Sequence, residues 1–367
     1  MKPYVPEKLP IEGLDFKHLF GLVGTANAEL ARYDGLLQGI VNPSVMLSPL
    51  TNEEAVLSSR IEGTQATVDD VLEQEAGLIK EGEKGEDIRE IINYREALRS
   101  GHRYLDGRPI TLSFVRQLHQ ILLNSVRGQD KTPGEFRRDQ NWIGTYGCTI
   151  EQASFVPPGP LQLPDHLEAW QTYLEYDDVD FLLQAAIVHA QFELLHPFKD
   201  GNGRIGRILI PLFLYQKKRL SQPMFYLSSW LEAHRDQYYA RLQDISRRGD
   251  WNGWVAFFLR GIAEQSRSNS VKVKAMLELY ERMKTQIHSI TRSQYTMHIL
   301  DAIFDRPIFE TTDFIRRTGI QKPTAFGLLR QLKEHRILSE LRAASGRRAA
   351  ILGFPELLNI AEGRTVV

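Results

Sequence analysis

The sequence predicts a mainly helical protein with one β-hairpin near its middle and a helix-and-hairpin domain at its C-terminal end. Residues 181–195 and 205–216 are rich in apolar and helix-forming residues and are separated by a short polar turn. Residues 132–163 are rich in glycine, proline, threonine, valine and aromatic residues, which favours short strands and turns. From about residue 293 the pattern changes to short helical segments followed by a second hairpin pattern. We therefore expect three regions, which comprise residues 1–80, 88–290 and 293–367.

The composition is that of an ordinary folded protein. Its 367 residues include 42% hydrophobic and 25% charged residues, and the formal net charge is −1. A charge so close to zero gives no overall attraction to nucleic acid or to an anionic membrane. Cys148 is the only cysteine, which excludes a disulfide framework within the chain and fits a reducing compartment. Without a signal-peptide pattern or a long apolar run, we expect a cytoplasmic protein that does not span a membrane.

The first region is expected to become helical after an extended N-terminal arm. Residues 14–37 have a helical composition, and Asn52, which two glutamates follow, is a plausible helix start. Gly63 is a natural helix stop, and Thr67, which two aspartates follow closely, predicts the start of another helix. Residues 80–88 are charged and glycine-rich, so we expect an exposed loop there.

The central region is expected to be a helical array that one hairpin interrupts. Two short strands are expected within residues 132–163, at Trp142–Ile143 and Ser154–Val156, joined by a turn through residues 146–147. The expected helices of this region comprise residues 88–103, 111–125, 164–175, 181–195, 204–216, 234–246, 251–264 and 271–287.

The polar turn between the two central helices holds the strongest chemical signal in the chain. It reads HPFKDGNGRIGR over residues 196–207. Gly201 and Gly203 allow positive φ angles and a close approach of the backbone to a ligand. The first N–H groups of the following helix have no intrahelical partner, so they favour an anion. Arg204 and Arg207 lie three residues apart and can face that anion together, which indicates a site for more than one phosphate.

Two further side chains of this run suit chemistry on a phosphate chain. Asp200 supplies a hard oxygen ligand for Mg²⁺, which commonly accompanies phosphates. The near-neutral pKa of a histidine makes His196 suited to removing a proton from a hydroxyl group. His119 is interpreted as a helix-surface residue without a role. His189 is interpreted as a packed or capping histidine rather than a second ligand. Each motif residue has a structural explanation when taken alone, but the complete run is much more specific.

The run resembles, without a single departure, the pattern H-P-F-x-D-G-N-G-R-x-x-R of the Fic-domain protein adenylyltransferases, which move AMP from ATP to a hydroxyl group of a target protein. The resemblance implies a Fic fold, which is a helical bundle with a β-hairpin flap, with ATP as substrate and Mg²⁺ as cofactor. It makes His196 the general base and Asp200 the Mg²⁺ ligand, and it places the phosphates on the G-N-G turn and on both arginines. Doc-type kinases lack the second glycine and the last arginine of the run, so AMP transfer is favoured over phosphate transfer. The implied nucleotide-binding residues are Gly201, Asn202, Gly203, Arg204, Ile205, Gly206, Arg207 and Tyr238.

A second motif precedes the central region. Residues 58–63, SSRIEG, are similar to the S-x-x-x-E-G signature of the Fic inhibitory helix, and their position resembles the class with an N-terminal inhibitory helix. The resemblance implies that Glu62 pairs with Arg207 and blocks placement of the γ-phosphate, with Ser58 as the other signature residue. A carboxylate and a guanidinium form a strong bidentate pair, and an arginine held in this way cannot also hold a phosphate. Inhibition within one chain and inhibition within an oligomer are both compatible with the sequence.

The resemblance also assigns the expected hairpin and a pair of tyrosines. The hairpin matches the flap that positions the target hydroxyl beside the nucleotide, and its edge can hold a target segment by strand addition. A purely structural hairpin is the alternative. Tyr238 and Tyr239 match a tyrosine pair that lines the adenine pocket, with Tyr238 preferred, and packing in the core is the alternative.

The C-terminal region, residues 293–367, resembles a winged helix-turn-helix domain. Its expected helices comprise residues 295–304, 311–317 and 322–336, and its hairpin lies within 337–353. The segment between Thr296 and Phe354 contains ten lysine and arginine residues and six acidic residues. DNA binding that uses Arg330 and Lys333 is therefore one alternative, and protein docking or dimerisation is the other.

We expect a protein adenylyltransferase that acts on a serine, threonine or tyrosine hydroxyl of a target protein and on its own surface. Two rival functions stay open. One is removal of AMP from a modified protein at the same site, with Glu62 aligning a water, and the other is a DNA-binding regulator that senses nucleotide. ATP and a target protein are the expected partners, a homodimer and DNA are open alternatives, and the sequence does not identify the target.

Overall fold

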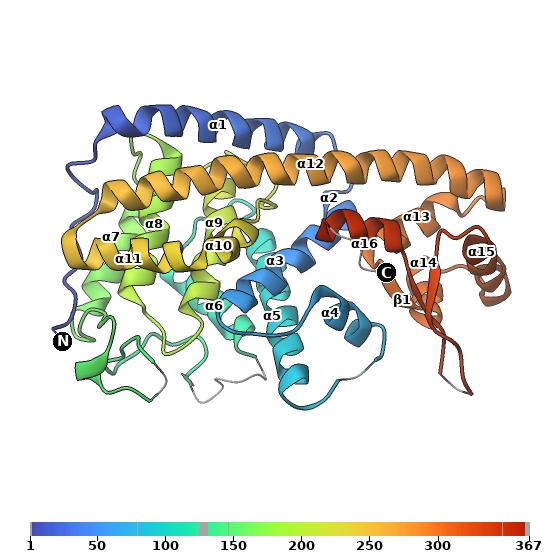
Figure 1. Cartoon of the computed structure of the whole chain (residues 1–367), viewed down its shortest axis with the longest axis horizontal. Helices are drawn as coiled ribbons and strands as arrows, with labels where there is room; N and C mark the ends of the chain where they lie inside the picture. The colour runs from blue at the N-terminus through green and yellow to red at the C-terminus, as the bar shows by residue number, and fades with distance from the viewer. Residues whose placement is uncertain (1, 79, 125–130, 146, 347, 364–367) are drawn as a thin grey trace. The chain divides into compact units, whose positions relative to one another are not determined.

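The computed structural model describes residues 2–78, 80–124, 131–145, 147–346 and 348–363, and it is mainly helical (Figure 1). The chain divides into two compact units. The first unit comprises Met1–Asp34, Leu57–Thr64 and Arg89–Arg267, and the second comprises Gly35–Val56, Gln65–Ile88 and Ser268–Val367. The helices that contribute residues to both units are α1 (Phe16–Gln38), α3 (Ser48–Ile61), α5 (Gly82–Tyr104) and α12 (Trp251–Thr291). The expected regions 1–80, 88–290 and 293–367 stay predictions.

The first unit is built around two consecutive helices, α8 (Phe181–Leu195) and α9 (Asn202–Gln216). α8 begins after Asp180, whose carboxylate accepts hydrogen bonds from the first N–H groups of the helix. It ends at His196, which has a left-handed conformation with φ of 45° and precedes a proline, where a helix cannot readily continue. Most residues of both helices are buried, so the pair forms the core of this unit. The prediction of a helix over residues 181–195 is confirmed.

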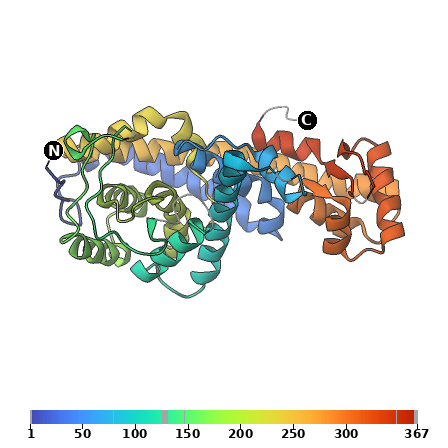
Figure 2. The same ribbon diagram turned by 90° about the horizontal axis from the view of Figure 1, so that it is seen from below.

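Other helices cover this central pair. α7 (Leu163–Glu175) and α11 (Arg235–Arg248) pack on α8, and α6 (Leu112–Leu122) packs on α9. Within this unit α1 runs beside the first part of α12 (Figures 1 and 2), where Arg267 pairs with Glu29 at 3.1 Å. The remaining elements of this unit are the short helix α10 (Ser228–Ala233) and a 3-10 turn at Ile150–Gln152.

Two expected boundaries were wrong. Residues 80–88 do not form a loop throughout, because α5 already begins at Gly82 and glycine and charge in the sequence did not prevent a helix. The two helices expected at 251–264 and 271–287 are one continuous helix of 41 residues, α12. The intervening polar residues, Gln265, Ser266, Asn269 and Ser270, are buried and engaged in contacts.

Among the described residues, the expected hairpin is reduced to one antiparallel bridge between Ile143 and Phe155. Tyr146, in the expected turn, lies outside the described residues. The N-terminal arm lies against the second segment of the hairpin, where the Tyr4 N–H donates to the Val156 carbonyl at 2.8 Å. We refer to residues 142–156 as the flap.

The second unit contains a small antiparallel sheet and short helices. α4 (Val68–Glu75) begins after Thr67, where a helix start was predicted, and has a capping box in which Thr67 and Asp70 exchange hydrogen bonds with each other's backbone. The sheet has the order β1-β3-β2, with Ile308 and Ser339 both opposite Gly353. The other elements of this unit are α2 (Pro43–Met46), α13 (Thr296–Asp305), β1 (Ile308–Glu310), α14 (Thr311–Thr318), α15 (Lys322–Glu334), β2 (Ser339–Arg342), β3 (Ile351–Gly353) and α16 (Pro355–Glu362).

This arrangement adds β1 and α16 to the elements expected for the C-terminal region. Its order is helix, strand, two helices and two strands, followed by α16. The assignment of residues 293–367 as a winged helix stays a prediction. Among the described residues, none of the helices is both long and apolar enough to cross a membrane.

Candidate active site

The loop between α8 and α9, residues 196–201, is closed by the first residue of α9. The Asn202 Oδ1 atom accepts the Phe198 N–H at 2.8 Å, and its Nδ2 atom donates to the Phe198 carbonyl at 2.9 Å. Gly201 has φ of 76°, a left-handed conformation that a glycine adopts without strain. Both side-chain bonds are buried, so they hold the loop in a well-defined backbone path.

His119 supports the same loop from α6, although we interpreted it as a surface residue. It is fully buried and stacks on Phe198 with ring centroids 3.7 Å apart. Its Nδ1 atom accepts the Gly134 N–H at 2.8 Å, so in the neutral ring the Nε2 atom carries the proton and donates to the Asp200 carbonyl at 3.0 Å. Burial lowers the pKa of His119 to about 4, which keeps this neutral form. The interpretation was wrong because both partners lie far from His119 in sequence.

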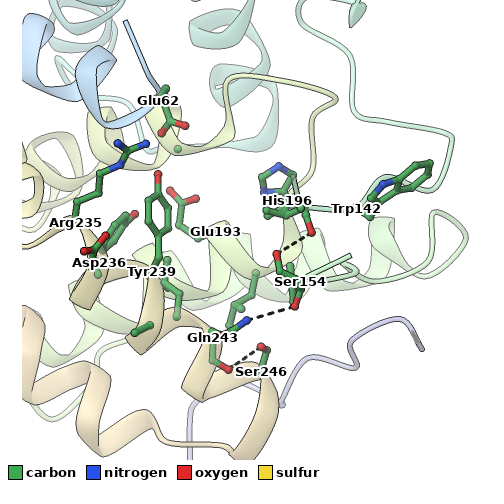
Figure 3. Close-up of a pocket in the computed structure, with 18 of the residues that line it drawn as sticks. Glu62, Trp142, Ser154, Glu193, His196, Arg235, Asp236, Tyr239, Gln243 and Ser246 are labelled. Carbon is green, nitrogen blue, oxygen red and sulfur yellow. Dashed lines mark hydrogen bonds between the residues drawn. The ribbon is translucent and has the colours of Figure 1, made fainter. Parts of the chain in front are cut away.

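His196 lines a cavity of about 790 Å³ whose wall also includes Glu62, Glu193 and Arg207. Figure 3 shows His196 between Glu193 on one side and the flap residue Trp142 on the other. The His196 Nδ1 atom has no hydrogen-bond partner among the described residues. Burial lowers the pKa of His196 to about 4, and Arg137 acts in the same direction. The imidazole is therefore neutral near pH 7 and able to accept a proton.

Asp200 and Arg204 form the second part of the site. The Arg204 side chain is buried and pairs with Glu90 of α5 at 2.8 Å, and its other terminal nitrogen lies 3.5 Å from Asp200 Oδ1. The Gly201 N–H also donates to Asp200 Oδ1 at 2.6 Å. The Asp200 side chain is nevertheless 43% exposed. The buried pair with Glu90 fixes Arg204, and one carboxylate stays accessible from solvent.

The donor set around Asp200 fits Mg²⁺ only as an ion that a nucleotide also binds. Among the described residues there is no group of three or more His, Cys, Asp or Glu side chains that could hold a metal ion. Mg²⁺ commonly takes one or two carboxylates and completes its shell with phosphate oxygens and water. One exposed carboxylate, that of Asp200, meets the protein's part of that requirement.

Arg207 is held by the end of α3. Its Nε atom donates to Ser58 Oγ at 2.8 Å, and its Nη2 atom donates to the Ser58 carbonyl at 2.9 Å and to Glu62 Oε1 at 2.6 Å. The Arg207 side chain is 1% exposed and that of Glu62 is 35% exposed. Burial acts to raise the pKa of Glu62, but the Arg207 charge and hydrogen bond outweigh it, and the net pKa is lowered. Glu62 is therefore an ionised partner of Arg207.

Two glycines of the motif make room for these carboxylates. A Cβ atom on Gly203 would lie 2.3 Å from Glu62 Oε1, and one on Gly206 would lie 2.3 Å from Glu193 Oε1. Such distances are shorter than any normal contact, so a side chain at either position would displace a carboxylate. Ile205 faces the core and is fully buried, which gives it a packing role rather than direct access to the cavity.

Glu193 is a residue of the cavity that the sequence did not single out. It lies three residues before His196 on α8, and its Oε1 atom is buried without a hydrogen-bond partner among the described residues. Burial raises the pKa of Glu193 to about 8, although Arg207 acts against this shift. Its position on the same helix as His196 was readable, but the packing of its carboxylate over Gly206 was not.

The two tyrosines of α11 have different environments. Tyr238 is 1% exposed, and its hydroxyl lies 3.0 Å from the His189 Nε2 atom, an arrangement that favours a packing role. Tyr239 is 42% exposed. Both contribute to the cavity wall, but the exposed ring of Tyr239 is better placed to stack on a base. His189 is buried, as expected, and also contacts the Gly206 carbonyl at 3.2 Å.

Comparison with known proteins identifies the family of the chain. Residues 20–103 match the Fic/DOC family N-terminal profile, and residues 109–214 match the Fic/DOC family profile, so that together they cover more than half of the chain. A protein adenylyltransferase Fic of Aedes aegypti is 32% identical over 151 residues, which are 40% of this chain and 27% of that protein. A probable protein adenylyltransferase of Aquifex aeolicus is 27% identical over 195 residues, which are 52% of this chain and 56% of that protein. The chain thus spans about a quarter to about half of the length of these relatives.

A solved structure shares the fold over nearly the whole chain. It is a Fic family protein from Desulfovibrio desulfuricans G20, with a TM-score of 0.58 and 18% sequence identity. The aligned region covers 96% of this chain and 98% of that protein.

Proposed function

Because the chain belongs to the Fic/DOC family, we propose that it is a protein adenylyltransferase that transfers AMP from ATP to a hydroxyl group of a target protein. The observation that carries this proposal is the shared cavity. It brings His196, with a neutral ring, together with Arg207 and with Gly203 in the first turn of α9. A base and an anion site at one cavity are the groups that phosphoryl chemistry on a hydroxyl requires.

The proposed reaction is a single displacement at the α-phosphorus of ATP. The target oxygen forms a bond to this phosphorus while its proton passes to His196. The bond from the α-phosphorus to the bridging oxygen breaks, and pyrophosphate leaves with the bonding electrons. The first N–H groups of α9 and the guanidinium groups of Arg204 and Arg207 offset negative charge on the phosphates.

Mg²⁺ bound to the phosphates would be held by Asp200 and would supply further charge neutralisation there. Asp200 is oriented for this role by the Gly201 N–H and by His119, which holds its carbonyl. Tyr239 is the proposed base-stacking residue, and the flap is proposed to place the target hydroxyl beside His196.

We further propose that Glu62 restrains the enzyme. Arg207 cannot hold a γ-phosphate while it donates to Glu62 at 2.6 Å and to Ser58. This pair forms within one chain, which supports restraint in cis. Removing the carboxylate would release one of the contacts that orient Arg207 toward α3.

The test is a transfer assay that uses Mg²⁺ and ATP labelled on the α-phosphate. It compares the parent protein with Glu62→Gly and with the double variant Glu62→Gly, His196→Ala, each with and without a protein extract as the source of target. We expect labelled protein with Glu62→Gly, much less with the parent and none with the double variant. Absence of label in all samples, with ATP binding confirmed by calorimetry, would contradict AMP transfer.

Removal of AMP is a second candidate, because Glu62 lies in the wall of the same cavity as His196 and its side chain is 35% exposed. Its carboxylate could orient a water toward a phosphodiester. Incubating a protein that carries AMP with the parent and with Glu62→Gln separates the two functions. Release of AMP by the parent alone would favour removal.

A further inference from the structure

Arg137 lies in the segment between α6 and the flap, and it contacts the backbone at the junction of α8 and the loop that follows it. It is 3% exposed, and its guanidinium donates to four backbone carbonyls. The Nε atom donates to His196 at 2.9 Å, and the Nη2 atom donates to Leu195 at 3.3 Å. The Arg137 N–H also donates to the Pro197 carbonyl at 2.9 Å. Three consecutive carbonyls at the end of α8 are thus satisfied by one residue.

These bonds explain how His196 keeps its backbone conformation. The last carbonyls of a helix have no intrahelical partner, and a left-handed conformation is strained for a residue with a Cβ atom. His196 has φ of 45° and follows the last turn of α8. Hydrogen bonds to its own carbonyl and to those on both sides hold the peptide planes that set the direction of the imidazole.

The same guanidinium also reaches both ends of the flap. Its Nη2 atom donates to the Pro158 carbonyl at 2.6 Å, just after the flap, and its Nη1 atom donates to the Asp139 carbonyl at 3.2 Å, just before it. Asn141 adds a bond from its Nδ2 atom to the Phe198 carbonyl at 3.1 Å. The end of α8 and both ends of the flap therefore meet at one planar group.

Arg137 forms no ion pair with an acidic side chain of the described residues, and burial lowers its pKa to about 10. A buried cation without a counterion is costly, so its orientation depends on the four carbonyl dipoles. Only the fork of a guanidinium offers donors in the directions that these carbonyls require, and a lysine would not replace it.

We propose that Arg137 is a positioning residue that sets the orientation of His196 and the distance between His196 and the flap. The proposal rests on the proposed AMP transfer for its kinetic test, but its structural test does not depend on activity.

The kinetic test compares Arg137→Met with Arg138→Met in the Glu62→Gly background. Arg138 is the adjacent arginine, and its side chain is 88% exposed, so it controls for loss of a positive charge. We expect kcat for Arg137→Met to fall about a hundredfold, as for a displaced catalytic group, with the KM for ATP changed about twofold at most. Arg138→Met should retain the kcat of the background. An unchanged kcat for folded Arg137→Met would overturn the proposal.

The structural test follows His196 by NMR in the protein with an intact Glu62. Because the Arg137 charge lowers the pKa of His196, Arg137→Met should raise this pKa and change the ring chemical shifts, whereas Arg138→Met should change neither. Glu62 and Asp200 also act on His196, and both variants retain them. If the Glu62→Gly variant is inactive, the proposed AMP transfer is contradicted. Unchanged NMR signals of His196 in Arg137→Met would by themselves overturn the role of Arg137.

Rescue by a small molecule covers the case in which Arg137→Met does not fold. A cavity of about 360 Å³ beside Arg137, lined also by Phe136, Leu163 and Leu167, gives a route for a small cation. Arg137→Ala purified with ethylguanidinium should gain kcat in a saturable way, and ethylammonium, which lacks the fork, should not restore it. Equal rescue by both cations would mean that charge alone suffices, and would overturn the positioning role.

Discussion

The motif loop has two faces that differ in how completely their polar groups are paired. On the back, the described side chains of Asn202, His119 and Arg137 donate to or accept from specific backbone atoms of the loop. On the face toward the cavity, the His196 Nδ1 atom and the Glu193 Oε1 atom have no partner among the described residues. The back therefore fixes the backbone, and the cavity face presents the side chains of His196 and Glu193 to a ligand.

This difference has an energetic meaning. A buried polar atom without a partner costs roughly 1–3 kcal/mol, and native proteins keep few of them. At Glu193, His196 and Arg207, which all line the cavity, this cost can be offset when nucleotide binds or retained for reactivity. Substitutions on the two faces should consequently have separable effects on turnover and on folding.

The largest expected effect is on the cavity face. In the Glu62→Gly background His196→Gln should lower kcat about 10³-fold because the base is lost, while the Kd for ATP and the melting temperature change little. His18→Gln is the matched control, since the side chain of His18 is 82% exposed. Rapid-quench transfer kinetics and calorimetry provide the two measurements. Transfer that persists in His196→Gln would show that another group takes the proton.

A smaller effect is expected when only the charge on Glu62 is removed. Glu62→Gln keeps the size and one acceptor oxygen but weakens the bond to Arg207, so initial transfer rates should rise about tenfold. The initial transfer rate of Glu62→Gly should be higher than that of Glu62→Gln. Glu81→Gln, a change at an exposed glutamate, should have the rate of the parent. A rate for Glu62→Gln equal to that of the parent would mean that size rather than charge restrains Arg207.

On the back of the loop the expected effect is on stability. Asn202→Ala leaves the buried Phe198 N–H without its partner and leaves the Phe198 carbonyl with the Asn141 Nδ2 bond alone, and should lower the free energy of unfolding by about 1–3 kcal/mol. Asn42→Ala should be nearly neutral, because Asn42 is exposed, makes no side-chain bond to the backbone of its helix, and accepts an exposed hydrogen bond from the Ser44 hydroxyl at 3.0 Å. Urea unfolding followed by circular dichroism measures both. Equal stability of the two variants would contradict the role of Asn202.

The smallest expected effect is that of pH. The pKa of His196 is lowered to about 4, so the neutral base persists as pH falls, and kcat should be flat between about pH 8 and 5.5. Protonation should reduce it only as pH approaches about 4. Glu62 raises this pKa, so the decline in Glu62→Gly should begin at a still lower pH. A decline centred near the ordinary histidine value of about 6.5 would indicate an imidazole in contact with solvent.

The sequence predicted the elements whose signals are local. The residues 181–195 formed α8 without adjustment, and Thr67 started α4 with its capping box, because both depend on neighbours within one or two turns. The contact between Glu62 and Arg207, 145 residues apart, was available only through the resemblance of two motifs to one family. Its inhibitory role stays a prediction.

Residues that act at a distance were missed. His119 contacts Asp200 across 81 residues, and Arg137 contacts His196 across 59. In the sequence, His119 resembles a polar residue on a helix surface. Arg137 is one of two adjacent arginines, and the sequence does not distinguish it from Arg138. Strand β1 was missed because its three residues are too short for a period of two to be recognised.

The three hydrogen bonds that tie Arg207 to α3 bear on how finely the restraint can be graded. One of them uses the Ser58 main-chain carbonyl, which no substitution at residue 58 removes, and another uses the Ser58 hydroxyl. Loss of the Glu62 carboxylate leaves both of these in place. Each lost bond should therefore weaken the restraint by a further step. Full release of Arg207 requires a movement of the C-terminal end of α3 itself.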